Sequence, residues 1–427
     1  MKKRIAIFPA GTEIGLEINR ALKYSTHLEI YGFTSFKDHS EYVYSNYVEG
    51  LPFYSDDSFI KELNYYLEKY KIDFIFPAHD DVQLFLTENA DKIKSLIITT
   101  DLKTVRVCRS KIETYNYFCN EDFVPKTYNN KRNVDLFPVF IKPDIGQGSR
   151  GAKVINNMFE LENAIYENQQ IVICEYLPGE EYTIDCFTDF NRNLRACKFR
   201  NRKRIKTGIS VNSEILPMDE EVFQIANIIN EKLKFNGAWF FQLKRDKHNK
   251  YKLLEIAPRV SGTMGLSRNT GINYSLLTIF NTMKIPVSII ENKYNIEVDR
   301  AFISRYKTDL EYDNIYLDLD DTLIENKKVN SFLMMFLYQI VNEHKKIILL
   351  TKHKEDTNAT LAKHKICPDL FSEIIHIKND DEKSEYIIRS KAIFIDDSFS
   401  ERYKVAQNTG IPVFDCSEIE ALIDWRV

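Results

Sequence analysis

The stretch Val139-Phe-Ile-Lys-Pro-Asp-Ile-Gly-Gln-Gly-Ser-Arg-Gly-Ala-Lys-Val-Ile155 holds two short apolar runs with a glycine-rich segment between them. The first run ends at Lys142, and the joining segment contains Gly146, Gly148 and Gly151. Two strands joined by such a loop would place backbone N–H groups and one fixed cation over a polyphosphate. The spacing differs from a Walker A loop, which closes with Gly-Lys-Ser/Thr, and from the dinucleotide fingerprint, which runs directly into a helix. An ordinary hairpin with a long turn accounts for the stretch equally well, so the rest of the chain must decide.

The composition is that of an ordinary soluble globular protein. The 427 residues suffice for two to four domains, with 44% hydrophobic and 28% charged residues. The net charge of −4 offers no argument for nucleic acid or an anionic membrane surface. Seven cysteines without a C-x-x-C pair indicate reduced thiols, and the N-terminal segment has too few apolar residues for a signal peptide. We expect a cytoplasmic protein with neither nucleic acid nor a membrane as partner.

The first hundred residues alternate predicted strands and helices, which favours a parallel, doubly wound α/β sheet. Strands are predicted at 4–8, 28–33 and 72–76, and helices at 14–22 and 59–70. Ligands of such sheets bind at the carboxyl ends of the strands. The third strand ends in Pro77-Ala-His-Asp-Asp81, so His79, Asp80 and Asp81 lie on this rim. Asp80 either contacts a substrate or caps the following helix.

Two basic features follow. Ser110 is a predicted helix cap, and Lys111 lies in the first turn, where a cation opposes the helix dipole. A phosphate-binding role would explain that position, although an exposed surface lysine is the simpler interpretation. The run from Arg195 to Lys206 carries seven basic residues and fits either a solvated hairpin or one that contacts an anion.

A second hairpin places two oxygen-bearing side chains together. Strands are predicted at 238–245 and 251–257, and a turn centred on His248-Asn249 puts Gln242 opposite Glu255. Side-by-side oxygen ligands on rigid strands suit Mg²⁺, which takes few protein ligands plus phosphate oxygens. Arg259 follows at once and offers a planar fork for a phosphate or acyl-phosphate.

Taken together, these features resemble the ATP-grasp superfamily, and most closely its carboxylate–amine ligases related to carbamoyl phosphate synthetase. The resemblance covers about residues 1 to 300. It rests jointly on Pro77-Ala-His-Asp-Asp81, Lys111, Ile141-Lys-Pro143, Gly148-Ser-Arg-Gly151, Glu175-Tyr-Leu-Pro-Gly-Glu-Glu181, Gln242 and Glu255-Ile-Ala-Pro-Arg259. It implies a Rossmann-like pre-ATP-grasp domain over 1–108 and α+β ATP-grasp domains over 109–300.

The resemblance also implies residue roles in binding Mg²⁺ and ATP. Lys111 and Lys142 would contact phosphates, with the loop of Gly146, Gly148, Ser149 and Gly151 closing over them. Glu175, Tyr176 and Leu177 would frame the adenine, with Glu181 or its neighbour near the ribose. Gln242 and Glu255 would hold Mg²⁺, and Arg259 the transferred phosphoryl group. The family usually has Asn two residues after the metal-binding Glu, whereas this chain has Ala257; one Mg²⁺ site is therefore weaker or completed by water.

A second set of motifs begins after a charged connector at about 292–313. Ile315-Tyr-Leu-Asp-Leu-Asp-Asp-Thr-Leu323 holds two carboxylates two residues apart, Lys346-Ile-Ile-Leu-Leu350 runs into Thr351, and Ala392-Ile-Phe-Ile395 runs into Asp396 and Asp397. In this order the motifs resemble the haloacid dehalogenase-like (HAD) phosphatases. The resemblance implies a Rossmannoid domain over 301–427, and the short gaps between the motifs leave no room for a large cap domain.

By that resemblance Asp318 is a nucleophile that forms an aspartyl-phosphate and Asp320 is the general acid/base. Thr351 would bind the phosphoryl group, and Lys383, or else Lys378, would balance charge. Mg²⁺ would be held by acidic side chains from both motifs: Asp318, Asp320, Asp396 and Asp397.

The combined hypothesis is a bifunctional enzyme: an ATP-dependent ligase that joins a small carboxylate to an amine through an acyl-phosphate, and a Mg²⁺-dependent phosphatase. The phosphatase would act on the amide product or its phosphorylated amine. An amino-alcohol phosphate and a sugar acid, as in bacterial surface-polysaccharide decoration, would fit, and so would a pair of amino acids. One alternative is a regulatory ATP-binding protein with a degraded grasp site and only the phosphatase active. A third is two unrelated enzymes fused for co-expression. The residue types leave the oligomeric state open, a homo-oligomer included.

Overall fold

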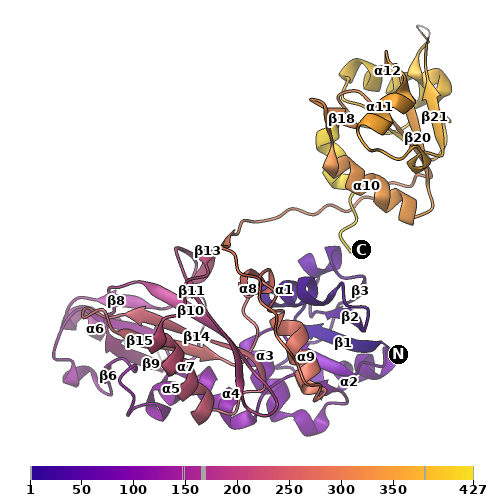
Figure 1. The fold of residues 1–427 in the computed structure, drawn as a ribbon. Coiled ribbons are helices and arrows are strands. Elements are labelled where there is room, and N and C mark those ends of the chain that lie inside the picture. The colour runs from indigo at the N-terminus through magenta and orange to yellow at the C-terminus, as the bar shows by residue number, and fades with distance from the viewer. Residues whose placement is uncertain (1, 147, 149, 165–169, 379–380, 427) are drawn as a thin grey trace. The chain divides into compact units, whose positions relative to one another are not determined.

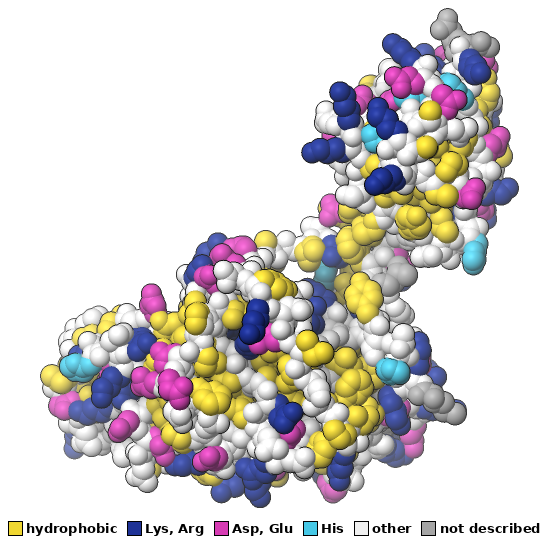
Figure 2. Space-filling model, in the orientation of Figure 1, with side chains coloured by type: hydrophobic (Ala, Val, Ile, Leu, Met, Phe, Trp, Pro, Cys, Tyr) yellow, Lys and Arg dark blue, Asp and Glu magenta, His cyan; other side chains and the backbone are white. Residues whose placement is uncertain are grey.

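The protein is described here by a computed structural model that covers residues 2–146, 148, 150–164, 170–378 and 381–426. The chain divides into two compact units, residues 1–302 and 303–427, and each is described by itself (Figure 1). On the face drawn in Figure 2, basic and acidic side chains are interspersed over both units, as the small net charge leads one to expect. Among the described residues, no helix combines the length and the apolar character needed to cross a membrane.

The first unit begins with a five-stranded parallel sheet of order β3-β2-β1-β4-β5, which confirms the parallel arrangement predicted from the alternating pattern. Ile5 and Ile7 of the central strand enter one apolar cluster while Ala6 and Phe8 enter another, because successive side chains point to opposite faces. Helices therefore cover both faces. The elements are β1 (Lys3–Phe8), α1 (Glu13–Leu22), β2 (Leu28–Phe33), β3 (Asn46–Val48), α2 (Phe59–Lys69), β4 (Phe74–Pro77), α3 (Asp80–Glu88) and β5 (Leu96–Ile97).

Two helices, α4 (Leu102–Arg109) and α5 (Lys111–Tyr117), lead into a four-stranded sheet of order β6-β9-β7-β8. Its strands are β6 (Thr127–Tyr128), β7 (Val139–Pro143), β8 (Lys153–Ile155) and β9 (Ile171–Glu175). β7 and β8 pair antiparallel, so the glycine-rich stretch is a hairpin. The helix α6 (Met158–Ala164) follows β8.

A second antiparallel sheet has the order β11-β10-β14-β15. Its strands are β10 (Glu181–Thr188), β11 (Leu194–Asn201), β14 (Gly237–Arg245) and β15 (Tyr251–Ala257). One face packs on α7 (Glu220–Lys232) through Ile184, Phe241 and the helix residue Ile225. Gln242 pairs directly with Glu255, which confirms the predicted register at the site. The same pairing does not continue to the turn, however, because the register shifts by one residue between Gln242 and Leu243.

Short elements complete the first unit. A three-stranded sheet of order β12-β13-β16 joins β12 (Arg204–Lys206), β13 (Ile209–Glu214) and β16 (Glu297–Asp299). Two helices follow the last strand of the large antiparallel sheet: α8 (Gly265–Arg268) and α9 (Tyr274–Thr282).

The second unit is another five-stranded parallel sheet, of order β21-β20-β17-β22-β23. Its elements are β17 (Asn314–Leu317), β18 (Ile324–Glu325), β19 (Lys328–Val329), α10 (Ser331–Asn342), β20 (Lys346–Thr351), α11 (Thr357–Lys363), β21 (Glu373–His376), β22 (Ala392–Ile395), α12 (Phe399–Thr409) and β23 (Val413–Phe414). The central strand is buried on both faces, with Ile315 and Leu317 in one cluster and Tyr316 in the other. The small β18–β19 hairpin and α10 occupy the chain between Asp318 and Thr351.

Candidate functional site

Two neighbouring cavities in the first unit share part of their walls. The larger has a volume of about 710 Å³ and the smaller about 160 Å³. Both are lined by Lys111, Gln242, Glu255 and the loop residues Gly146 and Gly148. Residues from α5, the glycine-rich hairpin and the β14–β15 hairpin therefore meet in one region.

The smaller cavity contains a buried ammonium group. Lys142 is 7% exposed, and its Nζ donates to the Tyr115 hydroxyl at 2.6 Å and to the Leu254 carbonyl at 3.1 Å. Burial lowers the pKa of Lys142, because the charged form loses its hydration. Among the described residues, no carboxylate lies within ion-pair distance of this nitrogen. Such a cation favours an anionic ligand.

Lys111 adds a second cation to the shared wall. Its Nζ donates to the Asp144 carbonyl at 3.1 Å, and burial lowers its pKa. The exposed surface lysine that the sequence first suggested is wrong, since this side chain is half-buried. Ser110 caps α5 as predicted, and its hydroxyl also donates to Asp144 at 2.9 Å, which holds the start of the helix against the glycine-rich hairpin.

The glycine-rich loop approaches another turn of the unit. Gly148 and Gly151 adopt left-handed φ values of 63° and 74°, which favour glycine. A side chain at Gly208, in the turn between β12 and β13, would collide with the backbone of Gly148. Gly151 lines neither cavity as described, and Ser149 lies outside the described residues.

The segment after β9 lines the smaller cavity with Glu175, Tyr176, Leu177 and, further on, Glu181. The carboxylate of Glu175 accepts a hydrogen bond from the Lys126 backbone N–H at 2.8 Å. Leu177 is buried and Tyr176 is 37% exposed. The carboxylate of Glu181 lies 3.1 Å from Nε of Arg202. An apolar and aromatic wall beside acceptors suits a planar polar ring.

Arg259 lines the larger cavity and forms a bidentate ion pair that the sequence did not reveal. Its Nε and Nη2 donate to the carboxylate of Asp80 at 2.6 and 2.7 Å. Burial alone would raise the pKa of Asp80, but the guanidinium more than offsets this and holds it at about 2. The predicted capping role of Asp80 is wrong, because Nδ1 of His79 accepts the hydrogen bond from the Asp81 N–H.

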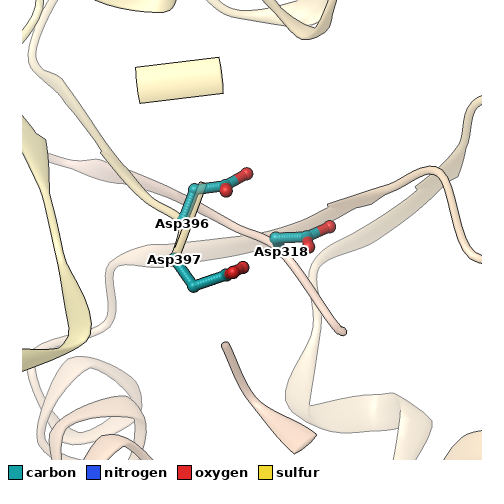
Figure 3. A group of neighbouring side chains, drawn as sticks. All are labelled: Asp318, Asp396 and Asp397. Atoms are coloured by element: carbon teal, nitrogen blue, oxygen red, sulfur yellow. The ribbon is translucent and has the colours of Figure 1, made fainter. Parts of the chain in front are cut away.

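The second unit gathers three carboxylates at adjacent strand ends. Asp318 follows β17, and Asp396 and Asp397 follow β22, which pairs with β17. One ligand oxygen of each lies within 4.8 Å of the others. Figure 3 shows the three side chains side by side. Nζ of Lys383 lies 2.8 Å from Asp318 and 2.7 Å from Asp396. Lys383 rather than the exposed Lys378 therefore contacts this acidic cluster.

Burial controls the electrostatics of the cluster. It raises the pKa of Asp396 to about 6 and also raises that of Asp318, although Lys383 opposes both changes. Burial alone would lower the pKa of Lys383, but the carboxylates of Asp318 and Asp396 together have the larger effect, so the pKa is raised. Three carboxylates facing one ammonium leave excess negative charge, and hard oxygen donors of this kind suit Mg²⁺.

Asp320 lies apart from this cluster. Its carboxylate is 52% exposed and contacts Nδ1 of His353 at 2.9 and 3.0 Å. The Asp320 side chain, expected to hold the metal as well, therefore lies outside the group of three carboxylates that could hold an ion. Nε2 of His353 lies 2.7 Å from the Thr360 hydroxyl. His353 was not predicted as a site residue, and its position two residues after Thr351 was the one available signal. The Thr351 hydroxyl accepts a hydrogen bond from the His353 N–H at 3.2 Å.

The first unit is similar in fold to proteins of known structure. Residues 167–302 match the family model described as ATP-grasp in the biosynthetic pathway with Ter operon. The Campylobacter jejuni biotin carboxylase–β,γ-ATP complex is 17% identical, with a TM-score of 0.57 over 68% of this chain and 74% of that one. Staphylococcus aureus N5-carboxyaminoimidazole synthetase with ADP is 16% identical, with a TM-score of 0.57 over 68% and 81%.

An L-amino acid ligase from Bacillus licheniformis is 16% identical, with a TM-score of 0.52 over 68% of this chain and 75% of that one. The curated proteins searched contain no match to the sequence. Identities this low show the fold, and the family match lies within the first unit. Residues 1–302 thus have the fold of the ATP-grasp proteins.

Proposed function

We propose that the first unit is an ATP-dependent carboxylate–amine ligase that uses Mg²⁺. The observation that carries this proposal is the meeting of Lys111, Lys142, Gln242 and Glu255 around two adjoining cavities. Two ammonium groups without a carboxylate partner among the described residues suit the phosphates of ATP. The β,γ-ATP complex and the ADP complex of two of the fold neighbours are in keeping with this ligand.

The residues present fit Mg²⁺. Gln242 and Glu255 offer an amide and a carboxylate oxygen from directly paired positions, and phosphate oxygens would complete the shell. The bound ion would neutralise charge on the transferred phosphoryl group. Ala257 lines the larger cavity and supplies no ligand atom, so the second Mg²⁺ of the related ligases would depend on water here.

The chain's own residues would then position the reactants. Lys111, Lys142 and the N–H groups of the glycine-rich loop would hold the triphosphate. A substrate carboxylate oxygen would attack the γ-phosphorus and release ADP, and Arg259 would offset the charge of the acyl-phosphate. The amine nitrogen would attack the acyl carbon, the C–O bond to phosphate would break, and the amine would lose a proton.

Production of ADP tests this proposal. Wild type should release ADP from Mg·ATP only with a competent acid and amine, and Glu255→Ala should abolish that release. If ATP binds but no pair in a broad panel of small acids and amines yields ADP, the alternative is favoured: a regulatory ATP-binding protein with a degraded grasp site.

We also propose that the second unit is a Mg²⁺-dependent phosphatase of the HAD type. The observation that carries this proposal is the cluster of Asp318, Asp396 and Asp397, of which the first two contact Lys383. Asp318 would attack the phosphorus of a monoester, and Asp320 would protonate the leaving alkoxide. Water would then hydrolyse the aspartyl-phosphate and restore the carboxylate.

The two activities can act in sequence: the ligase would join a carboxylate to a phosphorylated amine, and the phosphatase would remove that phosphate. An amino-alcohol phosphate and a sugar acid, as in surface-polysaccharide decoration, would fit. Supplied with ATP, Mg²⁺ and such a pair, Asp318→Asn should accumulate the phosphorylated amide. If wild type forms amide and Asp318→Asn accumulates no phosphorylated form, the two sites act on unrelated substrates.

A further inference from the structure

One polar row crosses all four strands of the β11-β10-β14-β15 sheet. Thr183 pairs with Arg200 on one side and with Gln242 on the other, and Gln242 pairs with Glu255. Directly opposed residues of antiparallel strands share a face. All four of these residues line the larger cavity. The proposed metal ligands occupy one end of the row, and Arg200 occupies the other.

Arg200 is held rigidly although it is 2% exposed. Its Nε and Nη2 donate to the carboxylate of Asp185 at 2.9 and 3.1 Å, and Nη2 also donates to the Ser261 hydroxyl at 3.2 Å. Asp185 is itself fully buried, and the Tyr274 hydroxyl donates to its backbone carbonyl at 2.9 Å. These contacts use three of the five N–H bonds of the guanidinium.

The two remaining N–H bonds are both on Nη1, and this atom is buried without a hydrogen-bond partner among the described residues. The hydroxyl oxygen of its cross-strand neighbour Thr183 is in the same condition. A buried polar group without a partner is destabilising, and a charged one more so. Two such groups on paired residues in a cavity wall indicate a place for an absent acceptor.

We propose that Nη1 of Arg200 and the Thr183 hydroxyl form a subsite for an oxyanion, a carboxylate or a phosphate, carried by one of the two ligase substrates. This inference rests on the proposed ligase function. Neighbouring strands lie about 4.8 Å apart, so roughly 10 Å separates the backbone of Arg200 from that of Gln242. Thr183 lies between the two, so the oxyanion would sit beside the ATP phosphates, on the Arg200 side of the row. The substrate is an acid with a second anionic group, or an amine that bears a phosphate.

Anion titrations of the full chain, saturated with Mg²⁺ and a non-hydrolysable ATP analogue, test the subsite. Inorganic phosphate and acetate serve as separate calorimetric probes at constant ionic strength. We expect one of them to bind wild type, phosphate if the group is a phosphate and acetate if it is a carboxylate. Arg200→Met should weaken this binding about tenfold or more, because a charge-assisted hydrogen bond is lost.

Two further variants keep the test decisive. Thr183→Val leaves the Arg200–Asp185 pair intact and should weaken the same anion several-fold even if Arg200→Met folds poorly. Arg204→Met, an exposed member of the same basic run, should bind like wild type. Undiminished anion binding by both Arg200→Met and Thr183→Val, or no anion binding by wild type, overturns the proposal. If the ATP analogue itself fails to bind, the ligase proposal fails, and titration without nucleotide still tests Arg200.

Discussion

The two parallel sheets of the chain have the same strand order but differ in the charge at their carboxyl ends. In both, the first strand of the sheet lies at the centre, flanked by the second and the fourth of that sheet's strands in chain order. At the first sheet the rim carboxylate Asp80 is matched by Arg259 in a bidentate pair. At the second, Asp318 and Asp396 share the ammonium of Lys383, and Asp397 lies beside them with no ion pair among the described residues. One topology thus supports a neutralised rim in one unit and a cation-attracting rim in the other, and the residues after each strand decide which.

The largest expected effect is the loss of phosphatase activity without loss of ligase activity. Asp318→Asn removes the nucleophile of the acidic cluster, so hydrolysis of p-nitrophenyl phosphate should fall about a thousandfold or more. Release of ADP by the first unit should stay at the wild-type level. Asp313→Asn, an exposed change immediately before β17, the strand that Asp318 follows, is the matched control and should keep both activities.

The reciprocal change is Lys142→Met. Loss of a cation at the triphosphate should lower kcat/KM for ATP about a hundredfold, with phosphatase activity unaffected. The free protein should also unfold at a higher temperature, because a buried ammonium whose pKa burial lowers has been replaced by an apolar chain. Lys153→Met, at an exposed position of β8, should change neither quantity. An unchanged KM and kcat in Lys142→Met would contradict the assignment.

A third prediction concerns His353, which contacts Asp320, the proposed general acid of the phosphatase. His353→Ala should slow hydrolysis of alkyl phosphates about tenfold or more, since a mispositioned general acid fails to protonate a poor leaving group. Hydrolysis of p-nitrophenyl phosphate, whose leaving group needs no proton, should change little. His353→Asn keeps a donor near the position of Nδ1 and should recover part of the loss. Equal losses on both substrates would mean that His353 is only structural.

The smallest expected effect is on the free energy of unfolding and concerns the Asp80–Arg259 ion pair at the rim of the first sheet. The pKa of Asp80 lies at about 2, below its usual 3.8. Its contribution to the free energy of unfolding is therefore present above pH 4 and is lost as the pH falls through 2. Asp80→Asn should reduce that free energy by about 2 kcal/mol near neutral pH, and the difference from wild type should shrink in acid. Urea unfolding across this range measures it, with the exposed Asp91→Asn as control. A difference that is independent of pH would contradict the ion-pair explanation.

The features of the fold and the site that could be predicted from the sequence are those that local periodicity determines. Gln242 and Glu255 could be placed opposite each other because strand period and turn position fix the register over a few residues. The Asp80–Arg259 pair joins residues 179 apart, and nothing local signals which arginine meets which rim carboxylate. Lys383 and Lys378 could not be distinguished, because the choice depends on how the chain returns to the sheet after β21. In the basic run, Arg200 is buried while Arg204 is exposed, a difference that only the neighbouring strands determine.

The register shift between Gln242 and Leu243 has a consequence for how the hairpin tolerates change. Phe240 and Phe241 pair with Ala257 and Ile256 on the site side of the shift, and Phe241 and Ile256 are anchored in the apolar core shared with α7. The tip over 246–250 lies beyond it. The bulge already tolerates one unpaired residue between the tip and the site. A short insertion at the tip should therefore be accommodated on the tip side of the bulge, while Gln242 stays opposite Glu255. The far end of this hairpin is thus a site where a peptide epitope can be grafted without disturbing the metal ligands.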